Sequence, residues 1–143
     1  MSASDLDRFI DQYHLALVDV NKGDAKPVLS MFSHREDVSL ANPLGPAVRG
    51  REDVEATVER AANHFREGYA TGFETIVKKV TPELAFILEV EHYKAKVDGR
   101  KDLSSKALRV TSIFRPEEGV WKLLHRHADY ITSARPAESG ILE

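Results

Sequence analysis

The second half of the sequence is a run of segments with the residue pattern of long β-strands. Val, Ile, Leu, Phe and Thr are concentrated in residues 71–80, 84–97, 106–115 and 120–132, and short turns rich in Pro, Gly and Asp separate these segments. Because consecutive strands with short connections pair with their neighbours in antiparallel fashion, we expect a meander. Strands of this length do not stay flat, so the sheet must twist and curl strongly.

The first half of the sequence has the spacing of amphipathic helices. Apolar residues recur at intervals of three and four residues over the first predicted helix, and Asn21-Lys22-Gly23 is typical of a helix end. The third predicted helix opens at Gly50-Arg51 and ends at Gly68. The other expected elements are helices over residues 4–21 and 24–32 and short strands over residues 37–41 and 48–49.

Helices and a short hairpin that precede a long meander are the pattern of the α+β class. The length of 143 residues predicts one domain over residues 1–143, with a core over about residues 4–132 and a loose tail over residues 133–143. Helices that cover the concave face of a curled sheet would enclose a cavity. A cavity of this kind is a natural place for a small ligand.

Composition excludes several classes of function. The net charge of −3 gives no reason to expect nucleic acid or an anionic membrane as a partner. The absence of cysteine excludes disulfides, thiolate catalysis and zinc sites built on cysteine. The first residues lack the pattern of a signal peptide, and no apolar run approaches the roughly 18–20 residues of a membrane span. We therefore expect a cytoplasmic protein.

The last predicted strand combines apolar and polar side chains. Its alternate positions are Trp121, Leu123, His125, His127 and Asp129. Strict alternation places these residues on one face of the strand. A face that begins with a tryptophan and ends with two imidazoles and a carboxylate suits the wall of a pocket. We therefore expect Trp121, His125 and His127 to share a face of a strand paired antiparallel to residues 106–115.

The order of these elements and three motifs resemble the nuclear-transport-factor-two-like superfamily, in particular its SnoaL-like bacterial branch. The motifs are Asn42-Pro43-Leu44-Gly45-Pro46 followed by Arg49-Gly50, Arg109-Val110-Thr111, and the run from Gly119 to Asp129. The last run is also similar to the end of the association domain of calcium/calmodulin-dependent kinase II. The resemblance extends from Leu6 to Asp129.

The resemblance implies a cystatin-like roll, that is, a cone-shaped curved antiparallel sheet wrapped around the N-terminal helices. It implies a pocket lined by the first helix, the Asn-Pro turn and the inner face of the sheet. It also implies a homodimer formed through the outer face of the sheet. Apolar residues on both faces of the strand over residues 84–97 agree with this dimer, because the face away from the helices also needs cover.

The superfamily contains ketosteroid isomerase, polyketide cyclases, scytalone dehydratase, limonene epoxide hydrolase and many non-catalytic modules, so the site must carry the functional argument. We expect a protein that binds a small organic molecule. It would use general acid/base catalysis as a cofactor-independent lyase, isomerase or hydrolase. The alternative is a ligand-binding or oligomerisation module without chemistry. We expect no cofactor and no metal, since a zinc site would need His92 beside His125 and His127, without a supporting motif.

Catalysis of this kind needs a carboxylate or an imidazole at the cavity, and Glu91, His127 and Asp129 are the candidates. We expect these three residues to form one polar cluster with Arg109, which would bind an anionic or carbonyl-bearing ligand. Arg109 would clamp a ligand carboxylate or form an internal ion pair with Glu91 or Glu89. The histidines of the last strand would otherwise pack over Trp121 and form hydrogen bonds across the sheet.

The candidate ligand-binding residues are Tyr13, Asn42, Arg109, Trp121 and His125. Tyr13 lies on the first predicted helix, where its hydroxyl could donate to a ligand oxygen. The Asn42 amide could point into the cavity or cap the turn. We expect Trp121 to form the floor of the pocket.

Overall fold

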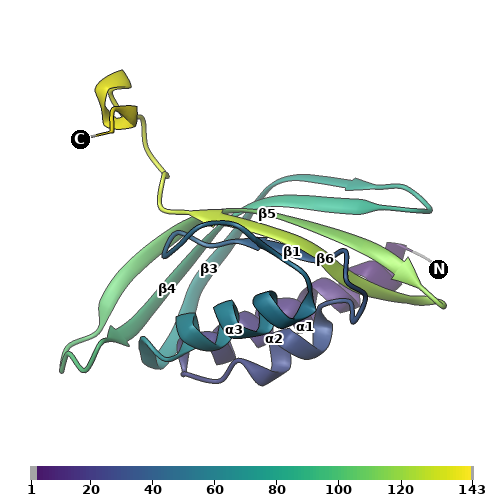
Figure 1. The fold of residues 1–143 in the computed structure, drawn as a ribbon, viewed down its shortest axis with the longest axis horizontal. Helices are drawn as coiled ribbons and strands as arrows, with labels where there is room; N and C mark the ends of the chain where they lie inside the picture. The colour runs from purple at the N-terminus through teal and green to yellow at the C-terminus, as the bar shows by residue number, and fades with distance from the viewer. Residues whose placement is uncertain (1–2, 143) are drawn as a thin grey trace.

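The computed structural model describes residues 3–142, in which helices lie against one face of a curved six-stranded sheet (Figure 1). The helices are α1 (Ala3–Asn21), α2 (Lys26–Met31) and α3 (Arg51–Ala62), and a short 3-10 helix, η1 (Ala137–Gly140), follows the sheet. The strands are β1 (Ser39–Ala41), β2 (Val48–Arg49), β3 (Phe65–Val80), β4 (Ala85–Val97), β5 (Ser104–Glu117) and β6 (Val120–Asp129).

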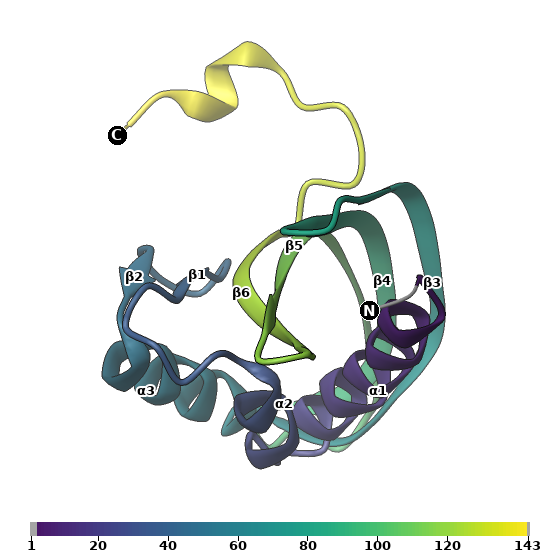
Figure 2. The same ribbon diagram turned by 90° about the vertical axis from the view of Figure 1, so that its right-hand side faces the viewer.

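The strand order is β2-β1-β6-β5-β4-β3, so the four long strands form the expected antiparallel meander. The sheet is mixed at one place, because β1 runs parallel to β6. The long strands curl around α1, and α2 and α3 continue the wall on the same side (Figure 2). The predicted α+β class and the curved sheet around N-terminal helices are confirmed.

The third helix is shorter than its sequence pattern indicates. It ends at Ala62, and β3 begins at Phe65, where it pairs with Val97. Pairing with β4 therefore overrides the helical spacing that extends toward Gly68. A Cβ atom at Gly68 would lie 2.4 Å from the carbonyl oxygen of Asn21. This glycine is needed because β3 passes directly against the end of α1.

A β-bulge interrupts the pairing of β5 with β6. Phe114 pairs with Leu123, whereas the preceding residue, Ile113, pairs with His125. Leu124 is therefore an extra residue in β6. An extra residue turns the side chains that follow it to the opposite face of the sheet.

The bulge changes which alternate positions of β6 point toward the helices. Trp121 and Leu123 point toward the helices before the bulge, whereas Arg126 and Ala128 are the buried residues after it. His127 is exposed on the outer face. The prediction that Trp121, His125 and His127 share one face is therefore wrong, although the predicted antiparallel pairing of this strand with residues 106–115 is confirmed.

The residues after β6 leave the sheet. The segment over residues 131–142 is exposed along its whole length and extends away from the strands (Figures 1 and 2). Among the described residues, no helix has both the length and the apolar character needed to cross a membrane.

The outer face of the sheet carries partly exposed apolar side chains at alternate positions, among them Phe86, Leu88 and Val90 of β4 and Ile113 of β5.

We propose that a second copy of the chain covers this face. Light scattering at micromolar concentration should give twice the 16.0 kDa of one chain. Leu88→Glu should give the mass of one chain, because it places a charge in the apolar contact. A single-chain mass for the unmodified protein would contradict the proposal.

Candidate functional site

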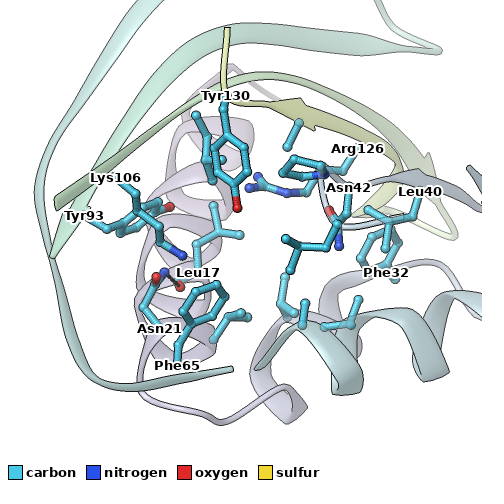
Figure 3. A pocket seen from close by; sticks show the side chains of 18 residues that line it. Leu17, Asn21, Phe32, Leu40, Asn42, Phe65, Tyr93, Lys106, Arg126 and Tyr130 are labelled. Atoms are coloured by element: carbon cyan, nitrogen blue, oxygen red, sulfur yellow. Dashed lines mark hydrogen bonds between the residues drawn. The ribbon is translucent and has the colours of Figure 1, made fainter. Parts of the chain in front are cut away.

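The helices and the inner face of the sheet leave a cavity with an empty volume of about 630 Å³, counting the part that is open to solvent (Figure 3). Most of its wall is apolar. The polar side chains that line it are Asn21, Asn42, Tyr93, Lys106, Arg126 and Tyr130. Within the described part of the chain, no aspartate or glutamate lines this cavity.

Arg126 and Glu91 form a buried ion pair beside the cavity. The Arg126 Nη1 and Nη2 atoms donate to the two Glu91 carboxylate oxygens, each over 2.8 Å. Glu91 is fully buried, and Arg126 is 7% exposed. Burial alone would lower the pKa of Arg126, but the Glu91 carboxylate raises it well above its ordinary value. Arg126 therefore stays charged at any physiological pH.

Hydrogen bonds from three further residues extend this pair into a network. The Tyr93 hydroxyl donates to Glu91 Oε1 over 2.7 Å, and Arg126 Nη1 donates to the Tyr13 hydroxyl over 2.8 Å. The Tyr13 hydroxyl oxygen accepts from Arg126, and the Tyr13 proton can be donated to the Ser112 hydroxyl oxygen, 2.6 Å away. Burial raises the pKa of both tyrosines, so both remain neutral donors. The network joins α1, β4, β5 and β6.

Glu89 is the second buried carboxylate on the inner face of β4, and it too has partners. Its oxygens contact His14 Nε2 at 2.8 Å and accept a hydrogen bond from the Thr75 hydroxyl over 2.8 Å. Burial alone would raise the pKa of Glu89, but His14 and Thr75 lower it overall. The His14 ring stacks on Phe73, with 3.8 Å between ring centroids. Neither inner carboxylate is therefore available at the cavity as a free base.

Lys106 projects from β5 into the cavity without a carboxylate partner. Its Nζ atom lies 3.3 Å from the centroid of the Phe65 ring and 5.5 Å from that of Tyr93. It forms no hydrogen bond or ion pair with any residue over 3–142. Burial and, secondarily, the charge of Arg126 lower the pKa of Lys106 to about 7, against the opposing effect of Glu91. Both the ammonium and the free amine are therefore populated near neutral pH.

Three further polar groups line the same cavity. Asn21 is buried and donates through Nδ2 to the Leu17 carbonyl over 2.9 Å, whereas its Oδ1 has no hydrogen-bond partner within the described residues. Figure 3 shows Tyr130 and Asn42 on the side of the cavity opposite the Asn21 amide, with the Tyr130 hydroxyl pointing inward. The cavity thus combines apolar walls, a lone amine, an unpaired acceptor and additional donors.

The predicted cluster of Arg109, Glu91, His127 and Asp129 does not form. Glu91 pairs across the sheet with Leu108, whereas Arg109 pairs with Val90 and faces outward. Arg109 donates to Asp129 at 2.6 and 3.1 Å on this outer face, where His127 is exposed as well. Register decides the result, since adjacent residues of a strand point to opposite faces.

The residues predicted to bind a ligand also separate. Asn42 lines the cavity, but Tyr13 is buried behind it in the hydrogen-bond network. Trp121 lies outside the cavity and borders a separate shallow hollow at the other end of α1. His125 contacts the Ser39 hydroxyl at 2.7 Å, and burial followed by the proximity of His127 lowers its pKa. Over residues 3–142, no three His, Asp or Glu side chains gather as a metal site.

Sequence reasoning missed Arg126 and Lys106. No local signal marks the bulge that turns Arg126 inward. Lys106, by contrast, shares its alternate positions with Leu108 and Val110, which are buried. A lysine in phase with the apolar face of a strand is a usable signal for an inward-facing charge.

The sequence and the fold were compared with known proteins. Residues 6–132 match the family model described as the SnoaL-like domain, so the chain belongs to this family. No curated protein matches the sequence.

Three solved structures illustrate the likeness in fold. A protein provisionally named a dehydratase of the NTF2-like family, from Streptomyces avermitilis, has 17% identity and a TM-score of 0.73 over 91% of this chain and 97% of its own. A ketosteroid isomerase-like protein from Erwinia carotovora atroseptica has 14% identity and a TM-score of 0.73 over 91% and 96%. A protein provisionally named a calcium/calmodulin-dependent kinase type II association domain, from Thiobacillus denitrificans, has 13% identity and a TM-score of 0.68 over 88% and 94%.

Replacing Arg126 tests the buried pair. Arg126→Met should lower the free energy of unfolding by about 3–5 kcal/mol, because it leaves the Glu91 carboxylate buried without its cation. Arg109→Met is the matched control on the outer face, where solvent screens the pair with Asp129, and it should change little. Urea denaturation of both variants measures the difference. Equal losses in the two variants would contradict the assigned role of Arg126.

Proposed function

We propose that this SnoaL-like protein binds a small, mainly apolar molecule that carries a carboxylate or carbonyl oxygen. We further propose that the Lys106 amine is the acid/base group of a cofactor-independent lyase or isomerase reaction on this molecule. The observation that supports the proposal is an amine without a carboxylate partner in a cavity that has no acidic lining residue over 3–142. A charge that is partly removed from water and has no partner is costly, so its presence needs a reason, and a ligand would provide one.

The arrangement suits proton transfer at a carbon next to a carbonyl group. A base whose pKa lies near the working pH takes up a proton and returns it with comparable ease. Lys106 has this property, since its pKa is about 7. The Tyr130 hydroxyl and the Asn42 amide border the same cavity and can donate to the oxygen on which negative charge develops. The names ketosteroid isomerase-like and dehydratase among the structural neighbours agree with this class of reaction.

A carboxylate base, by comparison, has little support in this chain. Glu91 is occupied by Arg126 and Tyr93, and Glu89 by His14 and Thr75. His127 and Asp129, which the sequence suggested, lie on the outer face of the sheet. Lys106 is the group that remains.

A non-catalytic binding module is the second candidate, because an ammonium group without a carboxylate partner can also hold a ligand anion. The two candidates need different forms of Lys106. A module that holds an anion needs the ammonium, so its affinity falls as the pH rises through about 7. An enzyme that removes a proton needs the free amine, so its rate with bound substrate rises over the same range.

Binding of two naphthalene compounds tests the pocket. Calorimetry should show that 2-naphthoate loses affinity on the order of tenfold between pH 6 and 8, following the charged fraction of an amine with a pKa of about 7. The neutral 2-naphthalenemethanol should bind independently of pH. The charged or titratable groups that face Lys106 are Glu91 and Tyr93 of β4, Arg126 of β6 and Tyr130. The pKa values of Tyr93, Arg126 and Tyr130 are raised from their ordinary values, so these three groups keep their protonation state over this range.

Two variants and a control give the test its specificity. Lys106→Met should abolish the pH dependence, whereas Lys94→Met removes an exposed lysine from β4 and should preserve it. Ala61→Trp should fill the cavity and prevent binding of both compounds. Binding that survives Ala61→Trp, or a pH dependence that survives Lys106→Met, would overturn the proposal.

A further inference from the structure

The position of the Lys106 amine suits a second kind of chemistry besides proton transfer. Its Nζ atom lies over the Phe65 ring, 3.3 Å from the centroid, and Tyr93 flanks it at 5.5 Å. These aromatic faces hold the side chain at the cavity without occupying the nitrogen lone pair through a hydrogen bond or ion pair. The amine is therefore open to a molecule that enters the cavity.

The surroundings of Lys106 increase the fraction of free amine near neutral pH. Burial lowers the pKa of the amine, and the Arg126 guanidinium lowers it further. Desolvation and a neighbouring cation are the two conditions that convert a lysine into a nucleophile near neutral pH. A surface lysine with a pKa of about 10.4 is almost entirely protonated under the same conditions.

A buried acceptor borders the same space. Asn21 Oδ1 has no hydrogen-bond partner within the described residues, and the residue is buried, with 3% of its surface exposed. The Asn21 backbone is fixed by the close passage of Gly68, and its Nδ2 by the Leu17 carbonyl. Figure 3 shows the Asn21 amide and the Lys106 amine pointing into the same part of the cavity. An unpaired buried acceptor is costly unless a ligand supplies a donor.

We propose that Lys106 forms an imine with a small aldehyde or ketone that enters the cavity, and that Asn21 Oδ1 accepts a hydrogen bond from the carbinolamine hydroxyl that precedes it. This inference rests on the proposed function, because it requires the same cavity to bind a carbonyl compound. The Lys106 lone pair forms a C–N bond while the carbonyl π electrons move to oxygen. Transfer of the two amine protons to this oxygen and loss of the C–O bond release one water and leave the C=N bond. The step needs no oxidant or reductant.

Reductive trapping with 2-naphthaldehyde tests the inference. The folded protein is incubated with this aldehyde and sodium cyanoborohydride at about pH 7, and peptide mapping by mass spectrometry locates the naphthylmethyl group. Lys106 should be modified on the order of tenfold or more faster than any other lysine, because surface lysines hold far less free amine at this pH. The α-amino group, whose ordinary pKa is about 7.7–8.0, is mapped separately.

Matched variants separate a site from general reactivity. Lys106→Arg keeps a cation and removes the primary amine, so the fast modification should disappear, whereas Lys94→Arg on the exposed side of β4 should leave it unchanged. Asn21→Leu should slow trapping at Lys106 without preventing the binding of 2-naphthalenemethanol. Thermal unfolding of each variant confirms that it folds.

The outcomes distinguish this inference from the proposed function. If 2-naphthalenemethanol binds while Lys106 reacts no faster than Lys94, the imine is wrong and the binding cavity stands. If the alcohol does not bind and Lys106 is not modified, both proposals are wrong. Fast trapping at Lys106 that 2-naphthalenemethanol suppresses would support both.

Discussion

The structure depends on the ion pair between Arg126 and Glu91, which lies where the curved sheet closes over α1. Moving two charges out of water costs several kcal/mol for each ion, and good geometry with further hydrogen bonds is needed to offset this cost. Both conditions are met, since the contact is bidentate and Tyr13 and Tyr93 complete it. The pair therefore fixes how α1, β4 and β6 meet, and this arrangement sets the inner wall of the cavity.

The bulge at Leu124 makes this pair possible. Without the extra residue, alternation would continue from Trp121 and Leu123 to His125, and Arg126 would point to the outer face. β6 also changes partners at this point. Ser33 donates to the Leu123 carbonyl before the bulge, and β1 pairs with β6 from His125 onward. The bulge thus lies where the neighbour of β6 changes from the segment at Ser33 to β1.

The pair has a consequence for Lys106. Glu91 is the carboxylate whose charge acts on the Lys106 amine, and its pairing with Arg126 leaves this amine without a carboxylate partner. Folding lowers the pKa of Lys106 from its ordinary value of 10.5 to about 7. The unfolded chain therefore binds more protons than the folded chain between these values. The burial of Lys106 consequently destabilises the protein most below pH 7, and the penalty shrinks as the pH rises toward 10.5. A cost of this kind is typical of a functional group rather than a structural one.

The sequence indicated the fold well and the site poorly, for reasons that particular residues make clear. Long-range periodicity identified the four long strands and the α+β class, and short turns fixed their order. The prediction of which face single side chains occupy was wrong for two reasons. The extra residue Leu124 reverses the faces of the second half of β6, and Arg109 pairs with Val90 instead of Glu91. Asn42 lines the cavity, which is one of the two positions that the sequence left open, because a turn next to the cavity does not depend on strand register. The inward position of Lys106 could have been predicted from the sequence, because Lys106 shares its alternate positions with Leu108 and Val110.

The central claim is that Lys106 faces the cavity without a carboxylate partner, and its own titration tests this claim most directly. Nuclear magnetic resonance of protein with ¹³C-labelled lysine Cε atoms follows each amine separately, and the spectrum of Lys106→Arg identifies the Lys106 signal. The account predicts a midpoint near pH 7 for Lys106, well below the ordinary lysine value of about 10.4. A Lys106 midpoint near 10.4 would contradict the account, because it would mean that the amine is solvated or paired.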